Sequence, residues 1–180
     1  MIKHLLLATA AFAFSSSAYA HSKDDHDSHE DFTLIHAGKV LAVPGKAPKS
    51  EQTIIIHDGK IVGIEAGYVE DDEATIIDGK DMFFLPGLID SHVHLRGEWS
   101  PSSRWDSVLL EPGDVAFQAA KHAKTTLMAG FTAVQDVGGP KEIFALKRAI
   151  NKGLIPGPHI QAAGSAVSIT GGHGDTHGFK

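Results

Sequence analysis

The hydrophobic pattern of the chain changes at Pro86, and its two parts predict different kinds of sheet. Before Pro86, short runs rich in β-branched residues are separated by turns. These runs occupy residues 32–36, 53–56, 61–64 and 75–77. Asp58-Gly59 lies between two of them, which is a strong hairpin signal, and Asp78-Gly79 repeats the pattern after the last. We therefore expect a small sheet whose short strands need a second layer to cover them.

After Pro86 the pattern alternates between strands and helices. The expected strands are residues 88–95, 131–137 and 159–163, and the expected helices are residues 115–129 and 141–152. Asp114 is a candidate N-cap for the first helix, and Gly130 is a candidate stop after it. A loop that contains Trp99 and Trp105 separates the first strand from this helix. The alternation predicts parallel β-α units, so the expected fold class is α/β.

The first 20 residues have the features of a secretory signal peptide. Lys3 provides the positive end, residues 5–14 form an apolar run, and Ala18-Tyr19-Ala20 is a cleavage signal. A membrane-spanning helix needs about 20 apolar residues, so this run is too short for a stable membrane anchor. We predict cleavage after Ala20 and a periplasmic or secreted protein.

Residues 21–31 follow the predicted signal peptide and form a polar segment of their own. They hold three histidines, five carboxylates and no apolar side chain. Such a segment has nothing to bury in a core, which favours a solvated linker. The alternative is a weak tail that scavenges divalent metal ions.

Composition narrows the range of functions. The 180 residues are 42% hydrophobic and 21% charged, values typical of a globular protein. Sixteen basic and 22 acidic residues give a net charge of −6, which argues against a nucleic-acid partner. The chain has no cysteine, so disulfides, thiolate metal sites and a cysteine nucleophile are excluded. With 12 histidines present, imidazole and carboxylate groups remain as the strong metal ligands.

His92 and His94 are the candidate metal ligands. Alternate side chains of a strand share a face, so both imidazoles are expected on one side, near the C-terminal end of the strand. Active sites of barrel enzymes lie at that end. Two imidazoles two residues apart can chelate one divalent ion, and Asp90 on the same face could orient one ring. We expect packing or surface roles for the other histidines of the strands and helices, which are His36, His57, His122 and His159.

Several segments resemble the amidohydrolase superfamily of metal-dependent hydrolases. Leu-Pro-Gly-Leu-Ile-Asp-Ser-His-Val-His at residues 85–94 is similar to the start of the family's barrel, and residues 130–139 are similar to its second barrel strand. Residues 149–158 and the loop Gly171-Gly172-His173-Gly174-Asp175 resemble the branch that contains imidazolonepropionase-like proteins and Xaa-Pro dipeptidases. The resemblance covers residues 32–180.

The resemblance implies a (β/α)₈ TIM barrel with a β-sandwich domain beside it. Residues 32–86 would belong to the sandwich, and residues 87–180 would form the first three β-α units of the barrel. It also implies one or two divalent ions, zinc first, with His92 and His94 as ligands. In the family a metal-bound hydroxide attacks an amide carbon while a carboxylate carries the proton.

The resemblance leaves alternatives open at residues near this site. His173 would bind substrate or metal, or would only shape the backbone of its glycine-rich loop. Asp136 would line the mouth of the site or cap the helix that follows it. His177 is expected to be a solvated loop residue.

The family's bridging lysine, its two further histidine ligands and its proton-shuttling aspartate have no matching position before Lys180. We therefore expect the N-terminal portion of an enzyme, inactive and poorly stable alone, whose catalytic residues lie beyond residue 180. A homo-oligomer would be a property of the full-length protein.

Two functional hypotheses follow. The first is an exported metal-dependent hydrolase that acts on C–N bonds of small amides, with dipeptides of the Xaa-Pro type preferred and a cyclic amide as the alternative substrate. The second is a non-catalytic periplasmic metal-binding protein that uses the polar segment at residues 21–31 and the pair His92 and His94.

Overall fold

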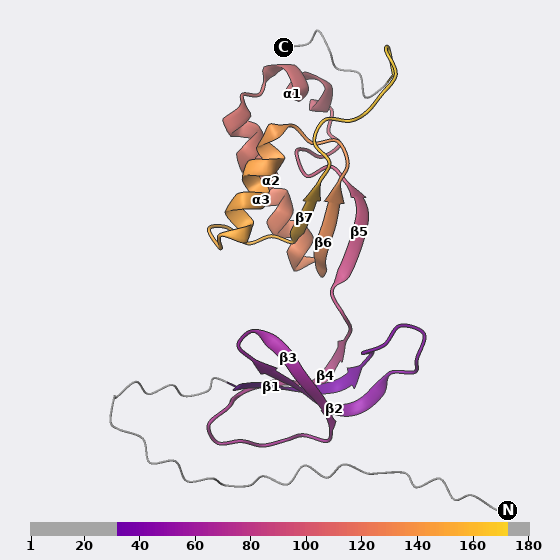
Figure 1. Ribbon diagram of the computed structural model, residues 1–180, viewed down its shortest axis with the longest axis vertical. Coiled ribbons are helices and arrows are strands. Elements are labelled where there is room, and N and C mark those ends of the chain that lie inside the picture. Colours follow the sequence, from indigo (N-terminus) through magenta and orange to yellow (C-terminus); the bar gives the residue numbers. More distant parts are fainter. Residues whose placement is uncertain (1–31, 173–180) are drawn as a thin grey trace, which may run out of the picture.

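The computed structural model describes residues 32–172, which form two lobes stacked along the long axis of the molecule (Figure 1). Residues 32–84 make the first lobe and residues 88–172 make the second. A short extended segment connects the two. The predictions that lie outside the described residues are those for the signal peptide, the polar segment at residues 21–31, His173 and His177.

The first lobe contains one mixed sheet. Its strands are β1 (Phe32–Val40), β2 (Lys49–His57), β3 (Lys60–Ala66) and β4 (Thr75–Phe84). The order across the sheet is β3-β2-β1-β4, with β1 antiparallel to β2 and parallel to β4. β2 and β3 form the predicted hairpin, and Asp58 and Gly59 at its turn have φ angles of 50° and 70°. Both angles lie in the left-handed region that two-residue hairpin turns require, so this prediction is confirmed.

Asp78-Gly79 does not form a second hairpin, which corrects the prediction for this repeat. β4 continues through it as one strand beside β1, where Gly79 pairs with Ala37. The register of the pair then shifts, and a Cβ on Gly38 at this bulge would lie 1.9 Å from the carbonyl oxygen of Lys80. The glycines here allow two backbones that are distant in sequence to approach closely, which a local pattern does not reveal.

A small apolar core holds the first lobe together. Its buried members are Ala37, Val40 and Ile54, and the residues packed against them are Ile35, Ile56 and Phe84. Other apolar side chains of this sheet remain exposed, among them Ile61, Val62, Ile76, Ile77 and Met82. Within residues 32–172 the first lobe contains this one sheet. The second layer of the expected sandwich therefore stays a prediction.

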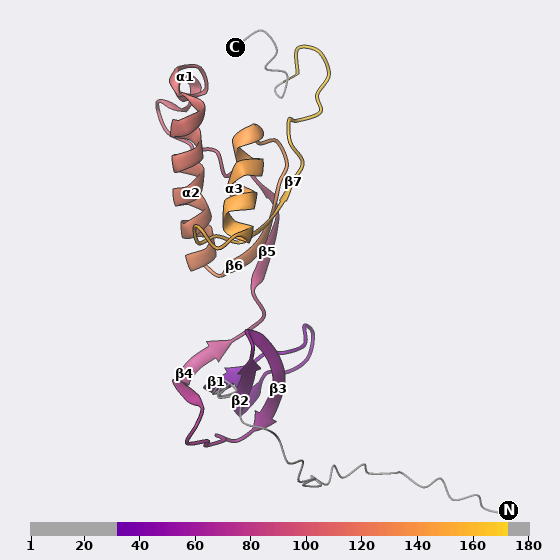
Figure 2. The same ribbon diagram turned by 60° about the vertical axis from the view of Figure 1, so that its left-hand side comes forward.

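The second lobe alternates strands and helices as expected. Its elements are β5 (Leu88–Val93), α1 (Ser103–Leu109), α2 (Pro112–Met128), β6 (Phe131–Asp136), α3 (Lys141–Asn151) and β7 (His159–Ala162). The strands form a parallel sheet in the order β5-β6-β7, and α2 and α3 cover one of its faces (Figure 2). The predicted β-α units and the α/β class are confirmed. Helix α1 lies where the sequence predicts a loop, because seven residues are too few for a helical period to show.

Helix α2 begins at Pro112, whereas the sequence predicts a start at Val115 with Asp114 as the N-cap. Glu111 is the N-cap, and it forms a capping box with Asp114, in which each side chain accepts a hydrogen bond from the other residue's backbone N–H. Proline fits the first helical position because the N–H that it lacks has no partner within a helix. Gly130 ends the helix as predicted, with a left-handed φ of 94°.

The core of the second lobe joins the inner faces of α2 and α3 to the sheet. Its buried members are Leu95, Ala119, Ala123, Val134, Ile143, Leu146 and Ile160. Ala119 and Ala123 lie one turn apart on α2, and their small side chains allow the helix to lie close to its neighbours. The outward faces of these helices mix charged side chains with exposed apolar ones such as Phe117 and Met128 of α2. No helix of the described residues is long and apolar enough to cross a membrane.

Gly38→Ala is expected to destabilise the first lobe. The new Cβ would lie 1.9 Å from the carbonyl oxygen of Lys80, so the backbones of β1 and β4 would have to separate. Overpacking of this kind costs about 1–3 kcal/mol of unfolding free energy, which urea denaturation measures. Gly63→Ala in β3 is the matched control, because its Cβ would meet no atom nearer than 3.6 Å. An equal loss of stability in both variants would contradict this account of the bulge.

Candidate metal centre

The C-terminal end of β5 brings His92 and His94 together. The centroids of their rings are 5.3 Å apart, and the ring planes meet at 83°. Both side chains are exposed to solvent. The structure therefore places two imidazoles side by side at the end of a parallel strand, as the spacing in the sequence predicts.

The strand does not remain regular up to this pair. Asp90 and Val93 of β5 are opposite Val134 and Asp136 of β6, so the register shifts by one residue between them. An extra residue on one strand is a bulge, which bends the strand and redirects the side chains that follow it. The regular alternation that the sequence predicts along β5 is therefore interrupted between Asp90 and Val93.

Asp90 is partly buried beside this bulge. Its Oδ1 atom accepts a hydrogen bond from the backbone N–H of His92 at 3.0 Å. The carboxylate thus holds the backbone of the first ligand candidate. Its expected contact with an imidazole ring remains a prediction.

Asp136 has a role that the sequence analysis missed. It lies at the end of β6, is fully buried, and its Oδ2 atom accepts a hydrogen bond from the backbone N–H of Leu95 at 2.8 Å. Helix α3 has Pro140 as its N-cap and no side-chain hydrogen bond at this cap, so the helix-capping alternative for Asp136 is wrong. The sequence signal that marks this residue is the pair Gly138-Gly139, because a Cβ on Gly139 would lie 2.6 Å from Oδ1 of Asp136.

The other histidines have packing or surface positions, in agreement with the sequence analysis. His36 is buried, and its Nε2 atom donates to the carbonyl oxygen of Val69 at 2.8 Å. His57 stacks on Phe32 with a centroid distance of 4.5 Å. The two that belong to the second lobe are His122, which bonds to a carbonyl oxygen, and His159, which is exposed.

The donor atoms at the end of β5 fit part of a divalent-metal site. Imidazole nitrogens are common zinc ligands, and catalytic zinc sites use about three protein ligands together with water. Within residues 32–172 no cluster of three or more histidine or carboxylate side chains is arranged to hold an ion. His92 and His94 therefore supply two donors to such a site.

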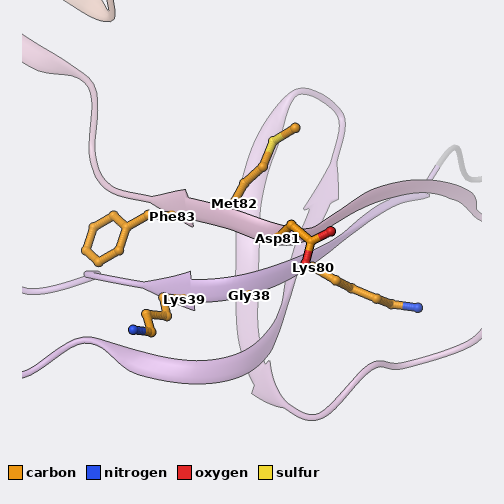
Figure 3. Close-up of a pocket in the computed structure, with 6 residues that line it drawn as sticks. All are labelled: Gly38, Lys39, Lys80, Asp81, Met82 and Phe83. Carbon is orange, nitrogen blue, oxygen red and sulfur yellow. The ribbon is translucent and has the colours of Figure 1, made fainter.

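A pocket of about 320 Å³ lies in the first lobe, at the bulge between β1 and β4 (Figure 3). It is lined by Gly38, Lys39, Lys80, Asp81, Met82 and Phe83. The side chains of Lys39 and Lys80 point to opposite sides, so their charges do not converge on one ligand (Figure 3). The ammonium of Lys80 lies 4.9 Å from the ring centroid of Tyr68, and partial desolvation, aided by nearby carboxylates, raises the pKa of that tyrosine. The pocket contains neither candidate metal ligand.

Comparison with known proteins identifies the family. The model of the amidohydrolase family matches residues 83–180, which is more than half of the chain. The chain belongs to this family, and the resemblance of the histidine segment is confirmed. Members of the family are hydrolases that generally depend on metal ions.

Individual relatives match most of this chain. A crystal structure of a Xaa-Pro dipeptidase with methionine bound in its active site is 36% identical, with a TM-score of 0.75, over 83% of this chain and 37% of that one. A prolidase structure complexed with N-methylphosphonate-L-proline is 29% identical, with a TM-score of 0.69, over 80% of this chain and 34% of that one. The ochratoxinase of Aspergillus niger is 32% identical over 151 residues, which are 79% of this chain and 30% of the relative. The chain thus spans about a third of the length of these relatives.

Gly138→Ala is expected to disturb His94 selectively. The new Cβ would lie 3.3 Å from Cε1 of His94, so the ring has to move by a few tenths of an ångström. The NMR resonance of the His94 Cε1 proton should shift, with a stability cost of about 1 kcal/mol. Gly97→Ala is the control in the same region, because its Cβ would meet no atom within 4 Å. An unchanged His94 resonance in Gly138→Ala would contradict the contact.

Proposed function

We propose that this chain is the N-terminal, metal-binding part of an exported amidohydrolase that cleaves C–N bonds of small amides. The observation that carries this proposal is the meeting of His92 and His94 at the C-terminal end of a parallel strand, with 5.3 Å between the ring centroids. That end is where enzymes built from β-α units keep their active sites. Residues 1–20, with the features of a signal peptide, support export to the periplasm or the medium.

The second lobe would form the beginning of a (β/α)₈ barrel. The parallel order β5-β6-β7, with α2 and α3 on one face, is the arrangement of successive barrel units. β5 and β7 are edge strands within the described residues, and an edge strand offers unpaired backbone groups to a further strand. Closure of the barrel would pair both edges and cover the apolar side chains that they carry, such as Leu88 and Ile89.

His92 and His94 would hold a divalent ion at this strand end. Zinc is the first candidate, because neutral imidazole is among its preferred ligands. Such an ion, when bound, polarises an amide carbonyl and lowers the pKa of a water molecule. The chain itself positions the two imidazoles, through the bulge in β5 and through Asp90, which holds the backbone of His92. Its glycine-rich segment 171–175 supplies His173, which we propose as a substrate contact.

Dipeptides of the Xaa-Pro type are the preferred substrate class. The Xaa-Pro dipeptidase and the prolidase with a bound proline phosphonate both match about four fifths of this chain. Both imidazoles are exposed, so a small substrate can reach them from solvent. A cyclic amide is the alternative substrate, and later parts of the barrel would decide between the two.

A non-catalytic metal-binding protein is the second candidate. It would use the pair His92 and His94 together with the three histidines of residues 21–31. The nucleotide sequence beyond codon 180 separates the two candidates. An in-frame continuation with a lysine and two separated histidines at strand ends supports the hydrolase. A stop codon at that point supports the second candidate if the 180-residue product is also stable, soluble and able to bind metal.

His92→Ala combined with His94→Ala is expected to abolish zinc binding at this site. Loss of two ligands should lower the affinity by more than the roughly 10–100-fold typical of residues that only support a ligand. The measurement is zinc content by mass spectrometry after dialysis of the chain from His21 onward, followed by assay with a panel of dipeptides. His159→Ala is the matched control. This histidine is exposed and begins β7, whereas the pair lies at the C-terminal end of its strand. An equal zinc content in the double variant and in His159→Ala would disprove the site.

A further inference from the structure

Leu95, the residue after His94, is held by side chains from two other elements. Its backbone N–H donates to Asp136 at the end of β6, and its carbonyl oxygen accepts from His122 of α2. We propose that Asp136 and His122 are positioning residues that form a clamp on Leu95 and thereby hold His94 beside His92. The proposal rests on the proposed metal-binding role of the histidine pair.

The Asp136 half of the clamp is a buried carboxylate. Asp136 has no exposed surface, and burial of such a group is costly unless hydrogen bonds satisfy it. Its Oδ2 atom accepts the N–H of Leu95 at 2.8 Å, and its Oδ1 atom accepts a longer bond from the N–H of Gly138 at 3.4 Å. Both partners are backbone donors, so a side chain with two acceptor oxygens suits the position. An asparagine amide would offer a donor to one of them.

The His122 half of the clamp comes from the middle of α2. The Nδ1 atom of His122 lies 2.9 Å from the carbonyl oxygen of Leu95. Because a carbonyl oxygen only accepts, Nδ1 must carry the hydrogen. The Nε2 atom of the same ring faces Glu98 of the loop after β5, with 3.8 Å between Nε2 and Oε2. His122 thus connects α2 to the segment that follows the histidine pair.

Together these contacts fix the backbone on both sides of His94. The side chain of Leu95 is buried in the core of the second lobe, and the carbonyl oxygen of Val93 accepts from the N–H of Val137 at 3.3 Å. The ring of His94 itself remains exposed between these anchored neighbours. A ligand whose backbone is already fixed loses less conformational freedom when it binds an ion. Loss of the clamp should therefore weaken metal binding without removal of a ligand.

The test compares two substitutions at each clamp residue in the whole 180-residue chain. Asp136→Ala and His122→Ala remove the bonds, whereas Asp136→Asn and His122→Gln each keep one group able to bond to Leu95. Thr53→Val is the matched control in the first lobe. Thr53 is fully buried and its hydroxyl also holds two backbone groups, the carbonyl oxygen of Gly67 and the N–H of Val69.

Two readouts are measured for each variant. The first is hydrogen exchange of the Leu95 amide without metal, and the second is the affinity for Co²⁺, followed by its visible absorption. The alanine variants should speed exchange at Leu95 and weaken Co²⁺ binding by about 10–100-fold, the range typical for groups that support a metal ligand. The conservative variants should be intermediate, and Thr53→Val should match the original chain in both readouts. Circular dichroism checks folding, and if Asp136→Ala does not fold, the His122 pair carries the test.

The outcomes distinguish this inference from the proposed function. Unchanged exchange at Leu95 in folded alanine variants, or faster exchange with unchanged Co²⁺ affinity, would overturn the clamp as a positioning device. An equal effect of Thr53→Val would overturn it as well. Failure of the original chain to bind Co²⁺ through His92 and His94 would instead disprove the proposed metal site, and the metal-free exchange would still show whether Asp136 and His122 hold Leu95.

Discussion

A buried carboxylate ties the ends of the strands in the second lobe together. Asp136 is removed from water, so its oxygens require donors, and those donors are backbone groups that follow β5 and β6. Its own carbonyl oxygen accepts from the N–H of Ala163, which follows β7, at 2.9 Å. One residue thus links all three strand ends at the edge of the sheet where His92 and His94 lie. These bonds anchor the backbone directly after His94 to the neighbouring strands.

The features that the sequence predicts correctly depend on residues close to one another in the chain. The Asp58-Gly59 turn depends only on two residues in the left-handed region. The left-handed φ of Gly130 depends only on the helix that ends before it. The meeting of the imidazoles of His92 and His94 is equally local, because one residue separates them. The alternation of strands and helices follows from patterns of period 2 and 3.6 that each element carries by itself.

The features that the sequence does not predict depend on distant partners. Asp78-Gly79 has the composition of a turn, yet it lies within β4. There it pairs with β1, and glycine allows the two backbones to approach closely. The bond between Asp136 and Leu95 joins residues 41 positions apart, and although Gly138-Gly139 marks the aspartate, no local pattern shows its partner. The start of α2 is a smaller case, since both Glu111 and Asp114 are plausible caps and the structure uses the two together.

The order of the strands has a consequence for how the chain folds during synthesis. In the first lobe β1 pairs with β4, and the β2-β3 hairpin lies between them in the chain. This sheet is therefore complete only after β4 has been synthesised. In the second lobe spatial order equals chain order, and each new unit can dock on the one before it as it leaves the ribosome. β5, which carries His92, emerges before the strand that ends in Asp136. Both imidazoles of a nascent chain therefore emerge before β6 can fix the backbone beside them. An ion bound at that stage would be held by two histidines whose backbone is not yet fixed.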